Sequence, residues 1–94
     1  MKHCVYMISN KKDGVLYVGK TKRLKQRIYQ HKSKAHPNTF SARYNLDKLM
    51  YFEEFQSHED ALLRERRIKK WKRAWKIELI EKSNPNWRDL YEEI

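Results

Sequence analysis

The sequence predicts a mixed α+β fold, with a small three-stranded antiparallel sheet flanked by helices in the order β-β-α-β-α-α. Two short runs rich in β-branched and aromatic residues, 5–8 and 15–18, are separated by turn-forming residues, which is typical of a β-hairpin. A third apolar run at 49–55 follows the first helical pattern, and two further helical patterns follow it. This element order indicates an α+β domain in which helices pack on a small antiparallel sheet.

The hairpin carries two tyrosines on one face. A loop over residues 10–13, with a positive φ at Gly14, would place Tyr6 directly opposite Tyr17. A one-residue slip would put the two rings on opposite faces of the sheet. The turn therefore determines whether the two phenols meet.

The first helix is expected to follow the hairpin, with Thr21 as its N-cap. Leu24 and Ile28, four residues apart, form an apolar stripe that predicts a helix packed on the sheet. Arg27 and His31 border this stripe instead of lying on the solvent side of the helix. The pattern thus places a guanidinium and an imidazole between helix and sheet.

Residues 36–44 lose helical periodicity and carry turn formers, so we expect a loop there. Loops of this length often carry function. Phe40, Arg43 and Tyr44 could stack on or clamp a nucleic acid strand. The alternative is that the aromatic rings only cover the core.

The third strand, at 49–55, is apolar enough at its start to be central or well covered. A capping box beginning at Ser57 then starts the second helix. On that helix Glu65 shares the inward stripe with Ile68, although an ionised glutamate is seldom buried unless it is paired or metal-bound. Two interpretations follow for Glu65: a metal ligand, or one half of an ion pair with Arg27 or a neighbouring arginine.

The second helix is expected to break near Trp71, where a fresh apolar stripe begins a third helix. We expect the rings of Trp71 and Trp75 to face the core, and the helix to end at Asn84 before a proline. Trp87 should fold back onto the core with Leu90. The tail, residues 91–94, is expected to be frayed.

The chain is expected to be one domain, 1–94, with a core of about 3–82 and a C-terminal extension over 83–94. Twenty-two Lys and Arg against twelve Asp and Glu give a formal charge of +10, so nucleic acid is the expected partner. A membrane partner is not expected, because no apolar run approaches the ~20 residues of a span. The single cysteine, Cys4, suits a small buried apolar role and a reducing cytoplasm.

The order of these residues resembles that of one known family, the GIY-YIG endonucleases, and in particular its short stand-alone members, which are similar to the N-terminal nuclease domain of the ABC excinuclease. The matching residues, in chain order, are Cys4-Val5-Tyr6, Tyr17-Val18-Gly19, Arg27 with His31, Arg64-Glu65 and Asn84-Pro85-Asn86-Trp87. Cys4 stands where the family has glycine, and Met7 where aliphatic residues are commoner. Neither change removes a side chain that the chemistry of the family uses.

The resemblance implies a metal-dependent endonuclease that hydrolyses DNA phosphodiester bonds, acts in DNA repair, and is directed by structure or damage with weak sequence specificity. It implies one Mg²⁺ or Mn²⁺ ion. The implied roles are Tyr6 as general base, Tyr17 as orienter of the phosphate or a bound water, Arg27 as stabiliser of transition-state charge, His31 and Lys20 as helpers of Tyr6 or the phosphate, Glu65 as metal ligand, and Gly19 and Asn84 as supports of the site.

A phenol titrates near pH ~10, so a tyrosine base needs help at neutral pH. The positive charges of Lys20, Arg27 and the metal ion would favour the phenolate of Tyr6. His31 is the alternative, because an imidazole can relay the phenol proton.

Nucleic acid should be held mainly through its phosphates. The residues expected to bind it are Lys22, Arg23, Arg43, Tyr44, Lys69, Lys70 and Arg73.

DNA is the expected substrate, with RNA as the alternative. We expect a monomer that a protein partner targets to its substrate. The alternative function is an inactive nucleic-acid-binding module that keeps the fold. Taken singly, each candidate residue also has a plain structural role: the tyrosines as a cross-strand pair, Asn84 as a helix stop.

Overall fold

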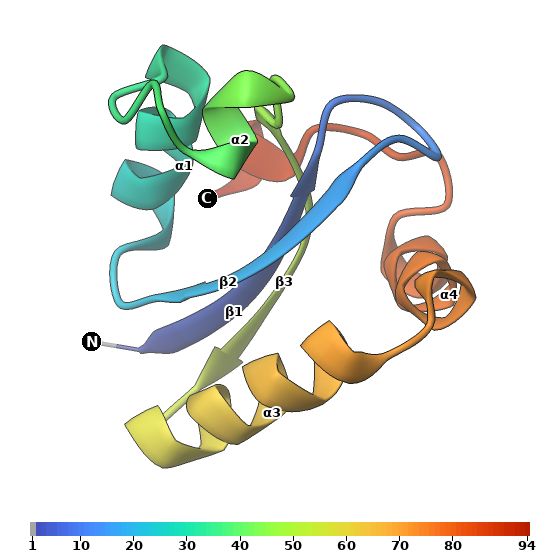
Figure 1. The fold of residues 1–94 in the computed structure, drawn as a ribbon. Helices are drawn as coiled ribbons and strands as arrows, with labels where there is room; N and C mark the ends of the chain where they lie inside the picture. Colours follow the sequence, from blue (N-terminus) through green and yellow to red (C-terminus); the bar gives the residue numbers. More distant parts are fainter. Residues whose placement is uncertain (1) are drawn as a thin grey trace.

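The computed structural model describes residues 2–94 and contains a three-stranded antiparallel sheet. Its strands are β1 (His3–Ser9), β2 (Leu16–Thr21) and β3 (Lys48–Phe55), which lie side by side in the order β2-β1-β3 (Figure 1). Every residue of β1 is buried, because this strand has a neighbour on both edges and helices on both faces. The strand expected at 49–55 is therefore an edge strand, and the hairpin strand β1 is the central one. The predicted α+β class with an antiparallel sheet is confirmed.

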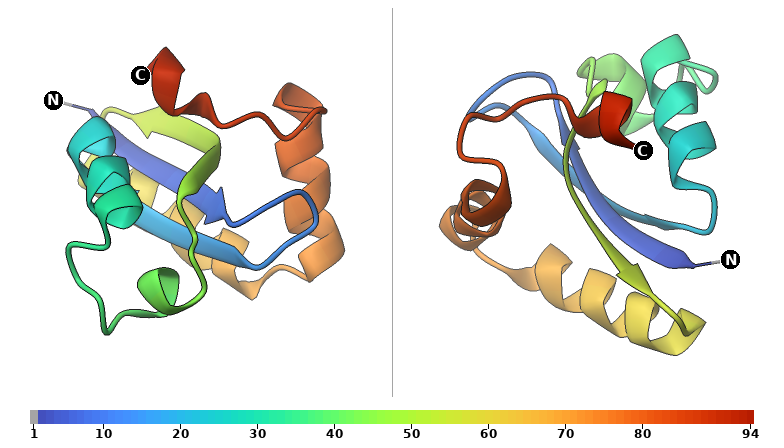
Figure 2. Two further views of the ribbon diagram at one scale, coloured as in Figure 1. Left: turned by 90° about the horizontal axis from the view of Figure 1, so that it is seen from above. Right: turned by 180° about the vertical axis from the view of Figure 1, so that it is seen from behind.

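The helices lie on both faces of the sheet. They are α1 (Leu24–Ser33), α2 (Phe40–Arg43), α3 (His58–Lys70), α4 (Arg73–Ser83) and the 3₁₀ helix η1 (Leu90–Glu93). Helices α1, α2 and η1 cover one face, and α3 and α4 cover the other (Figure 2). The predicted order of strands and long helices is present, and two short helices are added to it. Within residues 2–94, no helix has the length and apolar character needed to cross a membrane.

The alternation of side chains along β1 divides the core into two layers. Val5 and Met7 pack with Ile68 and Ile80 beneath α3 and α4. On the other face, Tyr6 belongs to the layer that also holds Ile8, Ile28, Leu46, Leu49 and Leu90. A tyrosine therefore occupies a fully buried core position on the face that α1 covers. Cys4 is buried, as expected for a small apolar residue.

The hairpin has a different register from the predicted one. Tyr6 lies opposite Gly19, and Tyr17 lies opposite Ile8, so the predicted direct pairing of the two tyrosines is wrong. The observed register of β1 against β2 differs from the predicted one by two residues, and a difference of two residues leaves every side chain on the predicted face of the sheet. The two tyrosine rings consequently remain on one face as a diagonal pair.

The turn explains this register. The loop between the strands covers residues 10–15, longer than the predicted 10–13, and Asn10 Oδ1 accepts a hydrogen bond from the Val15 amide at 3.1 Å. The positive φ falls at Asp13, at 57°, and not at Gly14. Aspartate tolerates this left-handed conformation, so glycine was the wrong residue to single out.

Two expectations around α1 and α2 need correction. Thr21 is the last residue of β2 and not the N-cap of α1, since that position falls to Arg23. Thr21 Oγ1 instead accepts a hydrogen bond from the Arg23 amide at 3.0 Å. Residues 36–44 are not all loop, because they contain α2, whose N-cap Thr39 accepts a hydrogen bond from the Ala42 amide.

The C-terminal half follows the prediction more closely. Ser57 caps α3, and this helix ends at Lys70 before Trp71 separates it from α4, as expected. Trp87 is buried as predicted, as is Leu90. The prediction that the ring of Trp75 faces the core is wrong, because this residue is 50% exposed. The expected frayed tail is also wrong, because residues 90–93 form η1 and Tyr91 packs against the core layer of Tyr6.

Candidate active site

The missing side chain of Gly19 makes room for the phenol of Tyr6. A Cβ atom at Gly19 would lie 2.4 Å from both Cζ and Oη of Tyr6. Real Cβ atoms do not approach other heavy atoms so closely, so any other residue at position 19 would displace the ring. Tyr6 therefore lies across the edge strand β2 with only 1% of its surface exposed.

The second tyrosine and a histidine complete an aromatic cluster around Tyr6. The ring centroid of Tyr6 lies 6.5 Å from that of Tyr17 and 5.8 Å from that of His31. The rings of Tyr17 and His31 are 6.1 Å apart. Arg27 lies one turn before His31 on α1, and its guanidinium donates to Gln30 Oε1 at 3.2 Å. The structure thus brings together the two phenols, the guanidinium and the imidazole that the sequence singled out.

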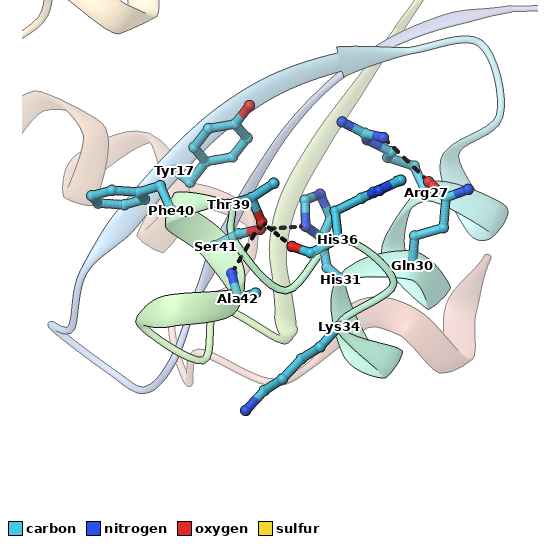
Figure 3. Close-up of a pocket in the computed structure, with 10 residues that line it drawn as sticks. All are labelled: Tyr17, Arg27, Gln30, His31, Lys34, His36, Thr39, Phe40, Ser41 and Ala42. Atoms are coloured by element: carbon cyan, nitrogen blue, oxygen red, sulfur yellow. Dashed lines mark hydrogen bonds between the residues drawn. The ribbon is translucent and has the colours of Figure 1, made fainter.

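A chain of hydrogen bonds sets the protonation of His31 (Figure 3). The Thr39 hydroxyl donates its proton to the His36 carbonyl at 2.8 Å, so Thr39 must accept from Ser41 across their 3.3 Å contact. Ser41 Oγ then accepts from His31 Nδ1 at 2.9 Å. The remaining nitrogen, Nε2 of His31, is left as an acceptor, and the Tyr6 hydroxyl donates to it at 3.1 Å.

Burial keeps both members of this pair uncharged at neutral pH. Burial raises the pKa of Tyr6 to about 12. The adjacent Arg27 guanidinium lowers this pKa, and the neighbouring Tyr17 and Glu65 raise it further. Burial and the charge of Arg27 lower the pKa of His31 to about 4. The pair is therefore a neutral phenol bonded to a neutral imidazole, and ionising Tyr6 requires a change in its surroundings.

Glu65 reaches the site from α3, on the other face of the sheet. Its side chain is 14% exposed, which agrees with the predicted inward position, and Oε2 lies 3.2 Å from Nζ of Lys69 one turn along the helix. The carboxylate is close enough to Tyr6 to raise the pKa of that phenol. The alternative interpretation, an ion pair of Glu65 with Arg27 or a neighbouring arginine, does not describe this contact: the partner of Glu65 is Lys69, and Arg64 bonds Glu53 at 2.9 Å.

A pocket of about 300 Å³ opens between α1 and α2 beside this cluster (Figure 3). Its lining comprises Tyr17, Arg27, Gln30, His31, Lys34, His36, Thr39, Phe40, Ser41 and Ala42, and so, within residues 2–94, it includes no acidic side chain. Arg27 and Gln30 also border a shallower depression that contains Lys22 and Arg23. The two hollows together form a basic surface that suits a phosphate backbone.

The comparison with known families agrees with this geometry. The family model described as the GIY-YIG catalytic domain matches residues 2–78. The chain belongs to the GIY-YIG family. Membership implies nuclease activity, and therefore a nucleic acid substrate.

Individual relatives of this GIY-YIG protein cover nearly its whole length. A UPF0213 protein of Clostridium perfringens is 38% identical over 87 residues, which span 88% of each chain. Another from Staphylococcus saprophyticus is 36% identical over 83 residues, covering 84% of this chain and 94% of that protein. The solution NMR structure of a UPF0213 protein from Bacillus halodurans superposes with a TM-score of 0.58 at 27% identity, covering 95% of this chain and 93% of that one.

GIY-YIG nucleases generally use divalent metal ions, so the donor set must be tested against such an ion. Within residues 2–94, no group of three or more His, Cys, Asp or Glu side chains could enclose a metal, so a zinc-type site with three or four protein ligands does not fit. Mg²⁺ is commonly held by one or two carboxylates together with water and substrate phosphates. Glu65 fits that description as a single carboxylate, and its present partner, Lys69, has a side chain that is 50% exposed.

Two predicted members of the GIY-YIG site lie outside the cluster. Lys20 is on the opposite face of β2 from Gly19, and its Nζ is 3.2 Å from Nδ1 of His58. Asn84 is buried, and its amide nitrogen donates to the carbonyls of Met50 and Arg88 at 3.1 and 2.8 Å. Asn84 thus ties β3 to the C-terminal segment, and any support it gives to the site passes through the fold.

The residues expected to bind nucleic acid divide into two groups. Lys22, Arg23, Arg43, Tyr44 and Lys70 present exposed side chains, with Lys22 and Arg23 next to the site and Arg43 and Tyr44 at the end of α2. Lys69 is paired with Glu65, and the Arg73 guanidinium donates to the carbonyls of Asp13 and Gly14, both at 2.6 Å. Arg73 therefore fastens the hairpin loop to α4.

Five polar residues that line the pocket were not predicted from the sequence: Gln30, Lys34, His36, Thr39 and Ser41. Gln30 sits one turn beyond Gln26 on α1, and helical spacing from Arg27 was enough to place it there. Thr39 and Ser41 act only because α2 turns back toward His31, and no local pattern indicates that contact.

Proposed function

We propose that this protein is a metal-dependent endonuclease that hydrolyses DNA phosphodiester bonds and selects DNA by structure or damage, with weak preference for sequence. The hydrogen bond from the Tyr6 hydroxyl to Nε2 of His31 carries the proposal. It joins a phenol to an uncharged proton acceptor beside Arg27, at the edge of a basic pocket.

In the proposed reaction, Tyr6 takes a proton from the attacking water while its own proton moves to Nε2 of His31. Ser41 holds the imidazole by accepting from Nδ1, so that Nε2 faces the phenol. Arg27 stabilises the charge that builds on the phosphate, and Tyr17 at the pocket wall orients that phosphate. A divalent ion held by Glu65 would supply further charge neutralisation at the phosphate oxygens.

This role for Tyr6 requires a rearrangement when substrate binds. Tyr6 is 1% exposed, whereas Tyr17, Arg27 and His31 line the pocket. One or more of these three side chains must therefore move to let a water molecule reach the Tyr6 hydroxyl. We propose further that the protein acts as a cytoplasmic monomer in DNA repair, and that a protein partner recruits it.

The second candidate function is a binding module without catalysis. The raised pKa of Tyr6, about 12, and the occupation of Glu65 by Lys69 favour it, because neither group is ready for chemistry in the free protein. DNA would still bind through the basic surface around Lys22 and Arg23.

A cleavage assay separates the two functions. Labelled duplex, forked and single-stranded DNA, with matching RNA, would be incubated with the protein in Mg²⁺, Mn²⁺ or EDTA. The nuclease proposal expects DNA cleavage in the metal ions, none in EDTA, and none by Tyr6→Phe, while the control Tyr29→Phe on the exposed side of α1 cleaves normally. Binding of DNA with no cleavage in any metal would instead establish the second candidate.

A further inference from the structure

Helix α2 and the residue that caps its C-terminus expose two aromatic rings next to the candidate active site. The ring centroid of Phe40 lies 6.5 Å from that of Tyr17, with 30° between the ring planes. Phe40 also lies 4.7 Å from Tyr44, with 39° between the ring planes. Phe40 is 47% exposed and Tyr44 is 50% exposed. Two neighbouring rings thus leave about half of their surface in water.

The same short helix fixes these rings relative to the catalytic cluster. Phe40 lies between Thr39 and Ser41, both of which belong to the hydrogen-bond chain that orients His31. The Leu46 amide donates to the Ser41 carbonyl at 2.8 Å and the Tyr44 amide to the Phe40 carbonyl at 3.1 Å, which closes the turn after α2. A group bound on Phe40 would consequently have a defined position relative to His31.

The surroundings of Phe40 favour one kind of ligand. Phe40 forms a wall of the 300 Å³ pocket, whose other walls include Arg27 and Lys34 (Figure 3). Phe40 and Arg27 lie at opposite ends of this pocket, with Tyr17 and His31 between them (Figure 3). An exposed ring and positive side chains in one pocket suit a nucleic acid strand, in which a flat aromatic base is joined to phosphates. Bases of an intact duplex are already stacked on their neighbours, so only an unpaired base can offer its face to the ring.

We propose that Phe40, supported by Tyr44, is a stacking platform for one unpaired base of a DNA strand whose adjoining phosphate lies at Arg27. This inference rests on the proposed nuclease function and names its substrate class: DNA with an unpaired nucleotide at the cleavage position, as in a bulge, a flap or a single strand. Stacking tolerates every base, which agrees with weak sequence preference.

A binding experiment in EDTA tests the platform without any cleavage. The probe is 2-aminopurine, placed either as a single-base bulge in a duplex or at a paired position in the same duplex, and its fluorescence is followed as protein is added. We expect quenching and tighter binding for the bulged DNA. Phe40→Ala should remove the quenching and weaken binding of bulged DNA on the order of tenfold, while binding of paired DNA stays unchanged.

Two further variants keep the result interpretable. Phe40→Leu keeps an apolar side chain without a ring and should lose the quenching as Phe40→Ala does. Tyr29→Ala removes an aromatic ring that is 60% exposed and outside the pocket, and it should match the wild-type protein. Equal weakening of bulged and paired DNA by Phe40→Ala, or wild-type quenching by Phe40→Leu, would overturn the platform.

The cleavage assay in Mn²⁺ keeps the two proposals apart. Ring-dependent quenching without cleavage of any DNA would support the platform and remove the nuclease function. Cleavage of paired and bulged DNA at equal rates by both the wild-type protein and Phe40→Ala would support the nuclease and remove the platform.

Discussion

Replacing His31 with glutamine should make the protein less sensitive to acid. In the fold His31 has a pKa of about 4, whereas an unfolded histidine titrates near 6.5. Between these two values the unfolded chain binds more protons than the folded one, so stability falls as the pH drops below 6.5 and the loss is complete below about 4. Well above pH 6.5 this histidine is neutral in the folded and the unfolded state, so its titration does not lower the stability of the fold.

The size of the loss follows from the difference between the two pKa values. One pKa unit corresponds to about 1.4 kcal/mol, so the difference corresponds to roughly 3 kcal/mol, and partial solvent screening of His31 reduces it to about 2 kcal/mol. A loss of this size is a large fraction of the stability of a small domain. His31→Gln has no group that titrates in this range, so it should lack this part of the acid loss.

Urea melts at pH 7.5 and pH 4.5 measure the effect as the difference in unfolding free energy for each variant. The control is His36→Gln, which removes an exposed imidazole. The backbone carbonyl of His36, and not its ring, accepts the hydrogen bond from Thr39, so the substitution keeps that bond. A nitrogen NMR spectrum of His31 at pH 7 should also show the proton on Nδ1. Parallel losses of stability in the wild-type protein and His31→Gln would refute the neutral, acceptor state assigned to Nε2.

Three further substitutions test the site. Arg27→Ala should lower the DNA cleavage rate ~10²-fold or more while the melting temperature changes little, because its charge acts on the transition state; a cleavage loss that only tracks unfolding would make Arg27 structural. Glu65→Gln should reduce the affinity for Mn²⁺, measured by calorimetry, and suppress cleavage, while DNA binding in EDTA stays equal or tightens. If the variant cleaves normally and loses stability whether or not metal is present, the only role of Glu65 is its ion pair with Lys69. Gly19→Ala should displace the Tyr6 ring, since its Cβ would lie 2.4 Å from the phenol, and so reduce cleavage and stability together; unchanged cleavage rates and melts would show that the ring has room to move.

The parts of the fold that were predictable are those that depend on local patterns. Alternating and helical apolar spacings located the three strands, α1, α3 and α4, and the Ser57 cap located the start of α3. The face shared by Tyr6 and Tyr17 was also predictable, although their register was not, because an error of two residues does not change the face.

Contacts between distant segments were not predictable in the same way. Arg73 bonds a loop about sixty residues before it in the chain, and Asn84 bonds a carbonyl of β3, so neither partner could be read from local spacing. Helix α2 is too short to produce a helical period, and its role depends on its contact with His31. The Glu65–Lys69 pair is different, since a Glu followed by a Lys four residues later on a helix is a local pattern that predicts such a pair.

The burial of Tyr6 links access to reactivity. Desolvation is the largest cause of its raised pKa, and the charge of Arg27 opposes that rise. A movement of Tyr17 or His31 that uncovers the Tyr6 hydroxyl lessens the desolvation and keeps the attraction of Arg27, so the pKa of Tyr6 falls as the hydroxyl becomes accessible. The same movement that admits water therefore also raises the fraction of Tyr6 that is phenolate at neutral pH, which is the form that could accept a proton in the proposed reaction. With its hydroxyl buried, the phenol stays neutral and bonded to His31, so the proposed catalysis depends on substrate binding to uncover it.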